Sequence, residues 1–306
     1  MSHASALGPE GDVWMAFLGI LLEGAPYLLL GTVISGLIDA FLPRGLLEKF
    51  LPRQRVPALM IAGLLGLVLP VCECAVVPII RRLLAKGLPL SCGLTYMLAA
   101  PIVNPIVAVS TWSAFQGQDP WWMVGSRLGL GYLVAVSCGW IVGRLPVKKV
   151  LLENVVSPLG FAEHSFQRLS DRLSHAATMA MHDFIDTGKY FVIGVLIAAL
   201  FNTQVLVQPS VQEAVINYGA MDAIAIPGMM LMALLLSLCS TTDAFIAAST
   251  QGVALSGKMA FLVFGPMMDL KLLVLYATIF QRGFVARLAI GLFGLVGMIT
   301  YIWSWR

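Results

Sequence analysis

The chain of 306 residues alternates between long apolar stretches and short polar segments. Each apolar stretch approaches or exceeds the roughly 20 residues that a helix needs to cross a bilayer. The pattern predicts eight hydrophobic segments, at residues 13–42, 57–87, 89–115, 121–143, 185–207, 226–256, 258–281 and 284–303. A signal-peptide core has only about 7–15 apolar residues, so the first segment is expected to remain as a membrane helix.

Two of these segments carry polar or helix-breaking residues at their centres. These residues are Pro70, Cys72, Glu73, Cys74 and Pro78 in segment 57–87, and the run from Cys239 to Asp243 in segment 226–256. Irregular backbone at membrane depth is tolerated only where protein buries it or where it lines a cavity. Each segment is therefore either a kinked crossing or a re-entrant hairpin that turns back.

The basic residues favour the hairpins. If both segments turn back, nearly all loop Lys and Arg residues fall on one side, and only Lys258 and Arg306 fall on the other. Cytoplasmic loops carry such an excess of Lys and Arg. We therefore predict an all-α integral protein of the cell (inner) membrane, with six full transmembrane helices, two broken or re-entrant helical hairpins and both termini outside.

The two halves of the chain resemble each other. An offset of 165 positions pairs Cys74 with Cys239 and Asn104 with Asp269. Three full crossings per half make the second copy enter from the opposite face, which gives an inverted structural repeat, an architecture typical of transporters. The expected divisions are a first transmembrane repeat at 1–143, a cytoplasmic amphipathic linker at 144–184 and a second transmembrane repeat at 185–306.

The composition excludes the soluble classes. The chain is 59% hydrophobic and only 11% charged, and its mean hydropathy is +0.88, whereas soluble domains are about 25% charged. No soluble fold hides so much apolar surface, which excludes a soluble enzyme, a nucleic-acid binder and a disordered scaffold. The lipid bilayer is the expected surrounding, and no nucleic-acid partner is expected.

Three cysteines at the breaks are the most specific candidate ligands. Cys72 and Cys74 flank the carboxylate of Glu73, and Cys239 is the repeat mate of Cys74. Soft sulfur beside hard oxygen suits Cu(I), Zn(II) or a trivalent arsenical. We expect these three cysteines to bind a metal ion or metalloid, and the other two cysteines of the chain to be small buried apolar residues.

Carboxylates within apolar segments are costly, so they are expected to face an interior cavity and to serve a substrate or proton path. These carboxylates are Glu73, Asp243 and Asp269, with Glu23 and Asp186 as further candidates that could instead be buried hydrogen-bond partners. Lys271, two residues beyond Asp269, is a candidate counter-charge inside the protein.

Prolines break the third element of each half. The breaking residues are Pro101 and Pro105 in the first half and Pro266 in the second. Proline removes an amide hydrogen bond and frees a backbone carbonyl. Freed carbonyls beside Asn104 and Asp269 would make polar ligands for a substrate.

Other polar residues are expected away from this site. Arg127 is expected to reach the lipid headgroups, and the tryptophans near helix ends to form an interfacial belt. His164, His175 and His182 are expected on a solvated amphipathic helix, with a regulatory metal site as the alternative. The chain has no H-E-x-x-H, no G-x-S-x-G and no phosphate-binding glycine loop, so we expect no catalytic residues and no cofactor.

The run Pro70-Val71-Cys72-Glu73-Cys74-Ala75-Val76-Val77-Pro78 and the later stretch Ala99-Ala100-Pro101-Ile102-Val103-Asn104-Pro105 resemble the predicted-permease family that includes organoarsenical and arsenite efflux permeases and a branch of copper/zinc efflux transporters. The resemblance covers nearly the whole chain. It implies a permease that expels a soft metal or metalloid, and it points to Cys72, Cys74, Pro101 and Asn104. Many members have a small residue between the two cysteines, and Glu73 in that place favours a metal cation.

The sequence therefore favours a secondary transporter that exports a soft metal ion or trivalent metalloid through a cysteine and carboxylate site at the midplane. Two alternatives stay open. The first is a proton- or sodium-coupled carrier of a small organic or inorganic anion, with the cysteines as bystanders. The second is a non-transporting membrane subunit that docks a partner through loop 144–184. Assembly into a homo-oligomer is also open.

Overall fold

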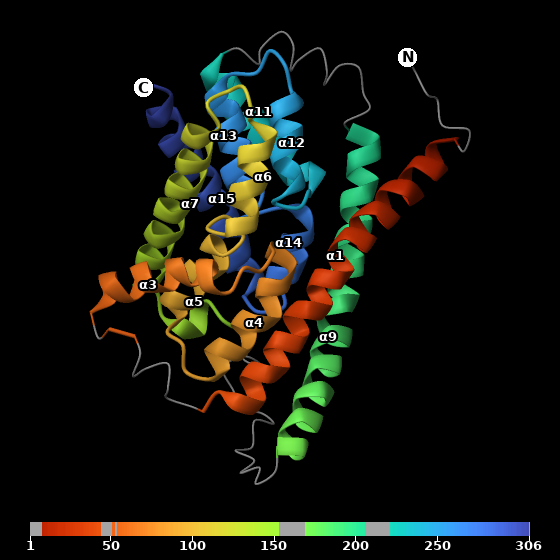
Figure 1. Ribbon diagram of the computed structural model, residues 1–306, viewed down its shortest axis with the longest axis vertical. Coiled ribbons are helices and arrows are strands. Elements are labelled where there is room, and N and C mark those ends of the chain that lie inside the picture. Colours follow the sequence, from red (N-terminus) through yellow and green to blue (C-terminus); the bar gives the residue numbers. More distant parts are fainter. Residues whose placement is uncertain (1–7, 44–50, 53, 153–168, 206–220, 306) are drawn as a thin grey trace.

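The computed structural model describes residues 8–43, 51–52, 54–152, 169–205 and 221–305. Over these ranges the chain is helical without a β-sheet, which confirms the all-α prediction for them (Figure 1). The first half contains α1 (Gly8–Phe41), α3 (Arg55–Val68), α4 (Glu73–Ala85), α5 (Leu90–Ala99), α6 (Pro105–Ala114), α7 (Pro120–Val142) and the short 3-10 helix η1 (Val147–Lys149). The second half contains α9 (Leu169–Val205), α11 (Asp222–Leu236), α12 (Thr242–Ser249), α13 (Leu255–Phe264), α14 (Leu270–Tyr276) and α15 (Arg282–Ser304).

Four helices of the described ranges are long and apolar enough to cross a membrane, namely α1, α7, α9 and α15. They correspond to the apolar segments predicted at 13–42, 121–143, 185–207 and 284–303. Two further pairs of short helices follow one another through the height of the molecule, α5 with α6 and α13 with α14 (Figure 1).

Both apolar segments with polar centres are broken. The helix α3 ends at Val68 and α4 begins at Glu73, and the intervening Pro70 cannot continue a helix hydrogen-bond ladder. In the second half, Ser237 adopts a positive φ of 49°, which ends α11 five residues before α12 begins. In Figure 1, α3 and α4 both lie in the lower half of the molecule, whereas α11 and α12 both lie in the upper half.

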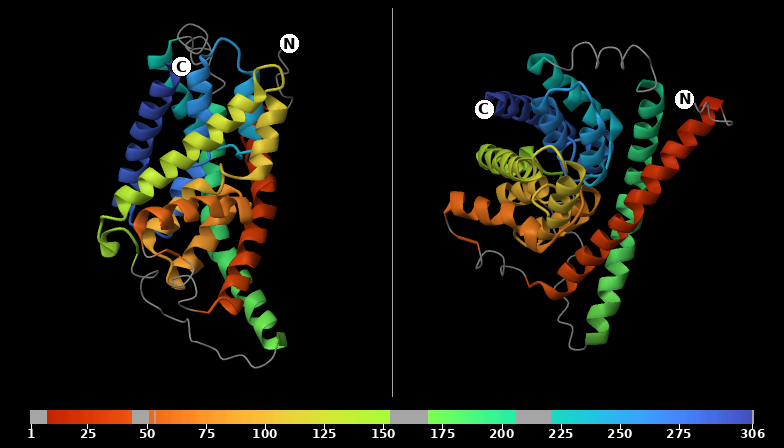
Figure 2. Two further views of the ribbon diagram at one scale, coloured as in Figure 1. Left: turned by 60° about the vertical axis from the view of Figure 1, so that its left-hand side comes forward. Right: turned by 45° about the horizontal axis from the view of Figure 1, so that its top comes forward.

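The helices α1 and α9 pack along each other and stand to one side of the remaining helices (Figure 2). The helix α9 begins at Leu169, so the division expected between residues 184 and 185 lies inside it. The segment from Leu169 to Val205 contains no proline, and the polar residues at the start of α9 are tolerated in a helix. The amphipathic stretch and the membrane segment therefore form one continuous helix. Residues 153–168 of the expected linker, His164 among them, lie outside the described residues.

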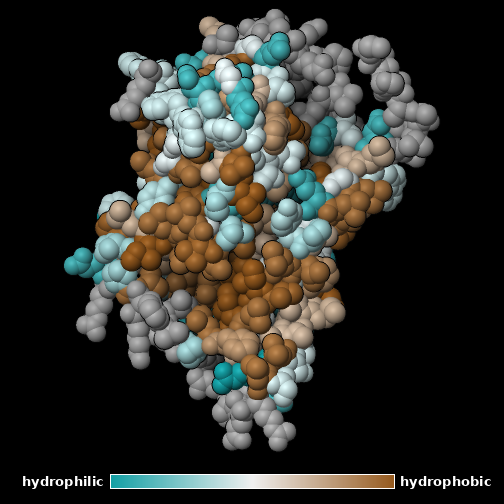
Figure 3. All heavy atoms as spheres, in the orientation of Figure 1, coloured by the Kyte–Doolittle hydropathy of each residue, from teal (hydrophilic) through white to brown (hydrophobic). Residues whose placement is uncertain are grey.

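Apolar side chains cover much of the outer surface. Figure 3 shows them gathered over the middle and lower part of one face, with hydrophilic residues concentrated at the upper end. Leu22, Val68 and Ile290 are strongly exposed examples on α1, α3 and α15. Such a large exposed apolar area is stable against lipid tails and would promote aggregation in water. The chain is a membrane protein.

A buried ionic cluster, which we name the anchor cluster, ties α1, α4 and α9 together. Arg82 on α4 makes two hydrogen bonds to the carboxylate of Asp183 on α9, at 3.0 and 2.9 Å. Asp39 on α1 accepts contacts from Lys86 Nζ at 3.4 Å and from His175 Nε2 at 3.2 Å. His175 therefore lies against the protein rather than on a solvated face, while His182 is exposed as expected.

Candidate substrate site

Two of the predicted polar residues cap the N-termini of helices. The side chain of Asn104 accepts a hydrogen bond from the amide of Ile106 at 2.9 Å and caps α6, whose first residue is Pro105. Asp269 accepts from the amide of Leu272 at 2.7 Å and caps α14 in the same way. Capping satisfies amides that have no partner within the helix, so both residues lie where a broken helix restarts.

The other predicted prolines have different roles. Pro101 and Pro266 are buried in the turns that follow α5 and α13, so they lie at helix breaks as predicted. The prediction that Pro78 breaks a helix is wrong, because α4 continues through it. Ser35 of α1 donates to the carbonyl of Pro78 at 3.2 Å, and α4 packs against several neighbouring helices that hold its two halves in line.

A small cavity lies beside the restart of α4. Its volume is ≈ 10 Å³, which is room for about one water-sized particle. It is lined by Ile20, Glu23, Gly24, Tyr27, Cys72, Glu73, Cys74, Phe191, Cys239 and Lys271. The structure thus brings all three candidate ligand cysteines to one cavity, from two segments of chain more than 160 residues apart.

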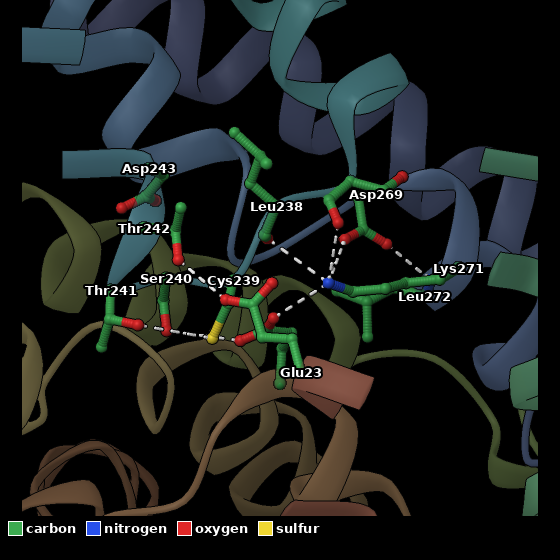
Figure 4. Close-up of polar contacts among 12 residues, drawn as sticks. Glu23, Leu238, Cys239, Ser240, Thr241, Thr242, Asp243, Asp269, Lys271 and Leu272 are labelled. Atoms are coloured by element: carbon green, nitrogen blue, oxygen red, sulfur yellow. Dashed lines mark hydrogen bonds and ion pairs between the residues drawn. The ribbon is translucent and has the colours of Figure 1, made fainter. Parts of the chain in front are cut away.

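The Lys271 ammonium lies among four oxygen atoms (Figure 4). Its Nζ donates to Glu73 Oε1 at 3.1 Å and to the carbonyls of Ser237 and Leu238 at 3.0 and 3.3 Å, and it lies 3.3 Å from Asp269 Oδ2. All three charged side chains are at most 4% exposed. We name these four oxygens and the ammonium the lysine cage.

The expected pairing of Lys271 with Asp269 is confirmed. Side chains two residues apart on a straight helix diverge, but Asp269 is a cap with extended backbone, φ −138° and ψ 177°, so its carboxylate turns toward the lysine. The partner that the sequence did not indicate is Glu73, which joins the cage from the other half of the chain.

Further hydrogen bonds connect the cavity to α12 and α1. The Ser240 hydroxyl donates to Glu73 Oε2 at 3.3 Å, and the Thr242 hydroxyl donates to Glu23 Oε1 at 2.7 Å. The Thr241 hydroxyl donates to Cys239 Sγ at 3.6 Å. Figure 4 shows these side chains directed toward the same space as the lysine.

Asp186 does not reach this space. Its side chain is about a third exposed and pairs with Lys189 at 3.0 Å and with His182 at 3.3 Å on the same helix. Of the two further candidates, only Glu23 therefore belongs to the cavity.

The prediction that Arg127 reaches the lipid headgroups is wrong. Arg127 is fully buried, and its Nη2 donates to Asp243 Oδ2 at 2.8 Å and to the carbonyl of Ser240 at 2.9 Å. Its Nη1 donates to the hydroxyl of Thr111 at 2.7 Å. The physical reason is the cost of burying Asp243, which requires a counter-charge that the long side chain of Arg127 supplies from α7.

The site has an excess of acidic groups. Glu23, Glu73, Asp243 and Asp269 supply four carboxylates, and Lys271 and Arg127 supply two cations, so full ionisation leaves two negative charges. Within the ranges that the structure describes, no group of three or more His, Cys, Asp or Glu side chains is arranged to hold a metal ion. The other cysteines, Cys92 and Cys138, are buried and do not line the cavity, as expected.

Comparisons with known proteins agree with this description. Residues 11–305 match the family model described as predicted permease. The chain is 35% identical over 272 residues to a Streptococcus mutans protein named as a two-component membrane permease complex subunit, covering 88% of this chain and 87% of that protein. It is 37% identical over 270 residues to the UPF0718 protein YcgR of Bacillus subtilis, covering 88% of this chain and 89% of that protein.

No solved structure matches the chain. The family match extends across the long helices, both broken segments and the cavity. The chain therefore belongs to the predicted permease family.

Proposed function

We propose that the chain is a permease that exports a soft metal ion or trivalent metalloid from the cytoplasm through the cavity at Cys72, Cys74 and Cys239. The observation that carries this proposal is the meeting of these three thiols at one cavity. Thiolate ligands select soft metals and metalloids, and metal binding requires them to lose their protons.

The size and charge of the cavity favour a cation. Its volume of ≈ 10 Å³ is room for about one water-sized particle, which favours a small cation over a larger organic anion. The carboxylates of Glu23 and Glu73 and the ammonium of Lys271 line it, so full ionisation leaves a net negative charge that would repel an anion. In this proposal the thiols bind the substrate, and Glu73, Asp243 and Asp269 balance the charges around it.

The packing of the helices supports the proposed inverted repeat. Contacts of α3 with α5 correspond to those of α11 with α13, and contacts of α5 with α7 correspond to those of α13 with α15. Contacts of α4 with α14 correspond to those of α12 with α6. We propose that α3–α4 and α11–α12 are re-entrant hairpins that enter from opposite faces, and that α5–α6 and α13–α14 are broken crossings.

Binding of the substrate to purified protein tests the function. Zn(II), Cu(I), arsenite and methylarsenite are each titrated into the wild type, into the Cys72→Ser, Cys74→Ser double variant and into Cys92→Ser. Cys92 is the matched control because it is buried outside the cavity. We expect the wild type and the control to bind one of the four, and the double variant to lose at least about 100-fold in affinity. Binding retained by the double variant removes the thiols from the mechanism.

Export is tested separately in everted membrane vesicles. Accumulation of the bound substrate inside such vesicles supports export, and accumulation only in right-side-out vesicles reverses the direction. Unchanged resistance of cells that carry the Cys72→Ser, Cys74→Ser variant at normal membrane abundance would contradict the proposed cargo.

A protein partner is the second part of the proposal. The Streptococcus mutans relative is named as a subunit of a two-component membrane permease complex, and we propose that this chain likewise works with a second subunit. Reconstitution of the purified chain alone in proteoliposomes tests this. Transport at the rate seen in native membranes would show that the second subunit is not required.

A further inference from the structure

The lysine cage has the composition of a cation site. Two carboxylate oxygens and two backbone carbonyls surround the Lys271 ammonium at 3.0 to 3.3 Å. Ser237 and Leu238 supply the carbonyls from the unwound end of α11, and transporters use such half-helix ends to bind cations. The ammonium is thus a cation that the chain itself places in this site.

The backbone of Lys271 is held in place. A methyl group at Gly194 of α9 would lie 2.9 Å from Lys271 Cα, so α9 packs directly on this part of α14. Movement of the ammonium must therefore come from rotation of its four-carbon side chain. Such a side chain has several rotamers at little cost.

The cavity provides a second position for the ammonium. Lys271 and Glu23 both line it, and Glu23 belongs to α1, a helix that supplies none of the cage oxygens. The volume of ≈ 10 Å³ is enough for one ammonium-sized group. A side-chain rotation can therefore exchange the cage carboxylates for the Glu23 carboxylate.

We propose that Lys271 is a tethered substitute for the transported cation. A metal ion that has bound the cavity thiols moves on to the place of the ammonium among the oxygens of Glu73, Asp269 and the α11 carbonyls, and the ammonium moves to Glu23. No covalent bond changes, and in both states a cation lies beside the two cage carboxylates. This inference rests on the proposed function and adds the residue that competes with the substrate.

The substitution has a consequence for the transport cycle. After the cation leaves, the returning ammonium offsets one of the two negative charges of the buried cage carboxylates, which lowers the cost of a conformational change in the empty protein. Removal of the ammonium should strengthen cation binding and block the return of the empty protein. Exchange of bound for free substrate does not require the empty protein to return to its starting conformation.

The experiment compares Lys271→Met with Lys258→Met. Lys258 on α13 is also a buried lysine, but it does not line the cavity. Zn(II) and Cd(II) binding to purified full-length protein, net efflux and isotope exchange in proteoliposomes are measured. We expect Lys271→Met to bind at least about tenfold more tightly, to lose net efflux and to keep exchange, while Lys258→Met resembles the wild type.

The outcomes separate the two proposals. Equal or weaker binding by a folded Lys271→Met variant, beside normal binding by the wild type, overturns the tethered substitute and leaves the proposed function standing. No binding by either protein overturns both. If Lys271→Met does not fold, Glu23→Gln takes its place, because it removes the second position and leaves the cage intact. At least about tenfold weaker binding then supports the inference, and unchanged binding overturns it.

Discussion

Arg127 on α7 and Asp243 on α12 form a fully buried ion pair, with Nη2 2.8 Å from Oδ2, that connects the first half of the chain to the second. The same guanidinium donates to the carbonyl of Ser240, in the loop that supplies Cys239 to the cavity. The pair therefore fixes the position of the second broken segment relative to the first half. We therefore expect loss of this ion pair to reduce the stability of the fold more than it changes the chemistry of the site.

Arg127→Met leaves the Asp243 carboxylate buried without its partner. Breaking one side of a buried pair costs about 3–5 kcal/mol, so we expect a large drop in membrane abundance and in the melting temperature of the purified protein. The double variant Arg127→Met, Asp243→Asn carries no unpaired charge and should recover much of that loss. Thermal unfolding in detergent measures both.

Arg287 provides the control for this prediction. It lies on α15, another long apolar helix, but its side chain is exposed and donates to the carbonyl of Gly283 on its own helix. Arg287→Met should change the melting temperature little. A loss as large as that of Arg127→Met would contradict the assignment of the effect to the buried pair.

Gly194→Ala tests the close packing of α9 on the lysine cage. The added methyl group would meet backbone of α14, which cannot move aside as a flexible side chain would. We expect a destabilisation of about 1–3 kcal/mol together with reduced transport. Gly188→Ala on the same helix has open space at that position and should be neutral or slightly stabilising, because alanine favours helices. Equal effects of the two variants would refute the packing argument.

Asp183→Asn tests the anchor cluster. Asp183 is 2% exposed and receives two hydrogen bonds from Arg82 and one from Ser35. The amide keeps the shape but removes the charge that balances Arg82, so we expect a loss of about 3 kcal/mol in unfolding free energy. Asp186→Asn, one turn along α9 and partly exposed, should stay within about 1 kcal/mol of the wild type, as exposed ion pairs contribute little.

Asn104→Ala tests the cap of α6. The side-chain oxygen of Asn104 satisfies the amide of Ile106, and alanine cannot replace it. Loss of such a cap costs about 1 kcal/mol, so a shift of a few degrees in melting temperature is expected. Asn104→Asp keeps the acceptor, as Asp269 does at the start of α14, so it should retain the cap; failure to do so would show that the amide group has another role.

The sequence predicted the elements with long apolar patterns well. The four long helices and the breaks near Pro70 and Cys239 follow from the length of the apolar runs and from the positions of polar residues within them. The start of α9 was missed, since a helix that leaves the membrane keeps no apolar signal beyond the hydrocarbon core.

The candidate site was predicted as a set of residues but not as a set of contacts. The cost of burying charge identified Glu73, Asp243 and Asp269, and the three candidate cysteines all line the cavity. The pairing of Glu73 with Lys271 and of Asp243 with Arg127 depends on how helices from different halves pack. One sequence carries no signal for such contacts, and Arg127 was misplaced because arginine near a helix end usually reaches the headgroups.

Pro78 lies between the two ends of α4, with the cavity at Glu73 before it and the anchor cluster at Arg82 after it. A proline nitrogen has no hydrogen to donate, so the carbonyl of Cys74 lacks its usual helical bond at this point. The helix is therefore most easily bent between its two ends. The lower end is fixed to α1 and α9 by the ion pairs of Arg82, so a tilt of the end that carries Cys74 would bend α4 at Pro78.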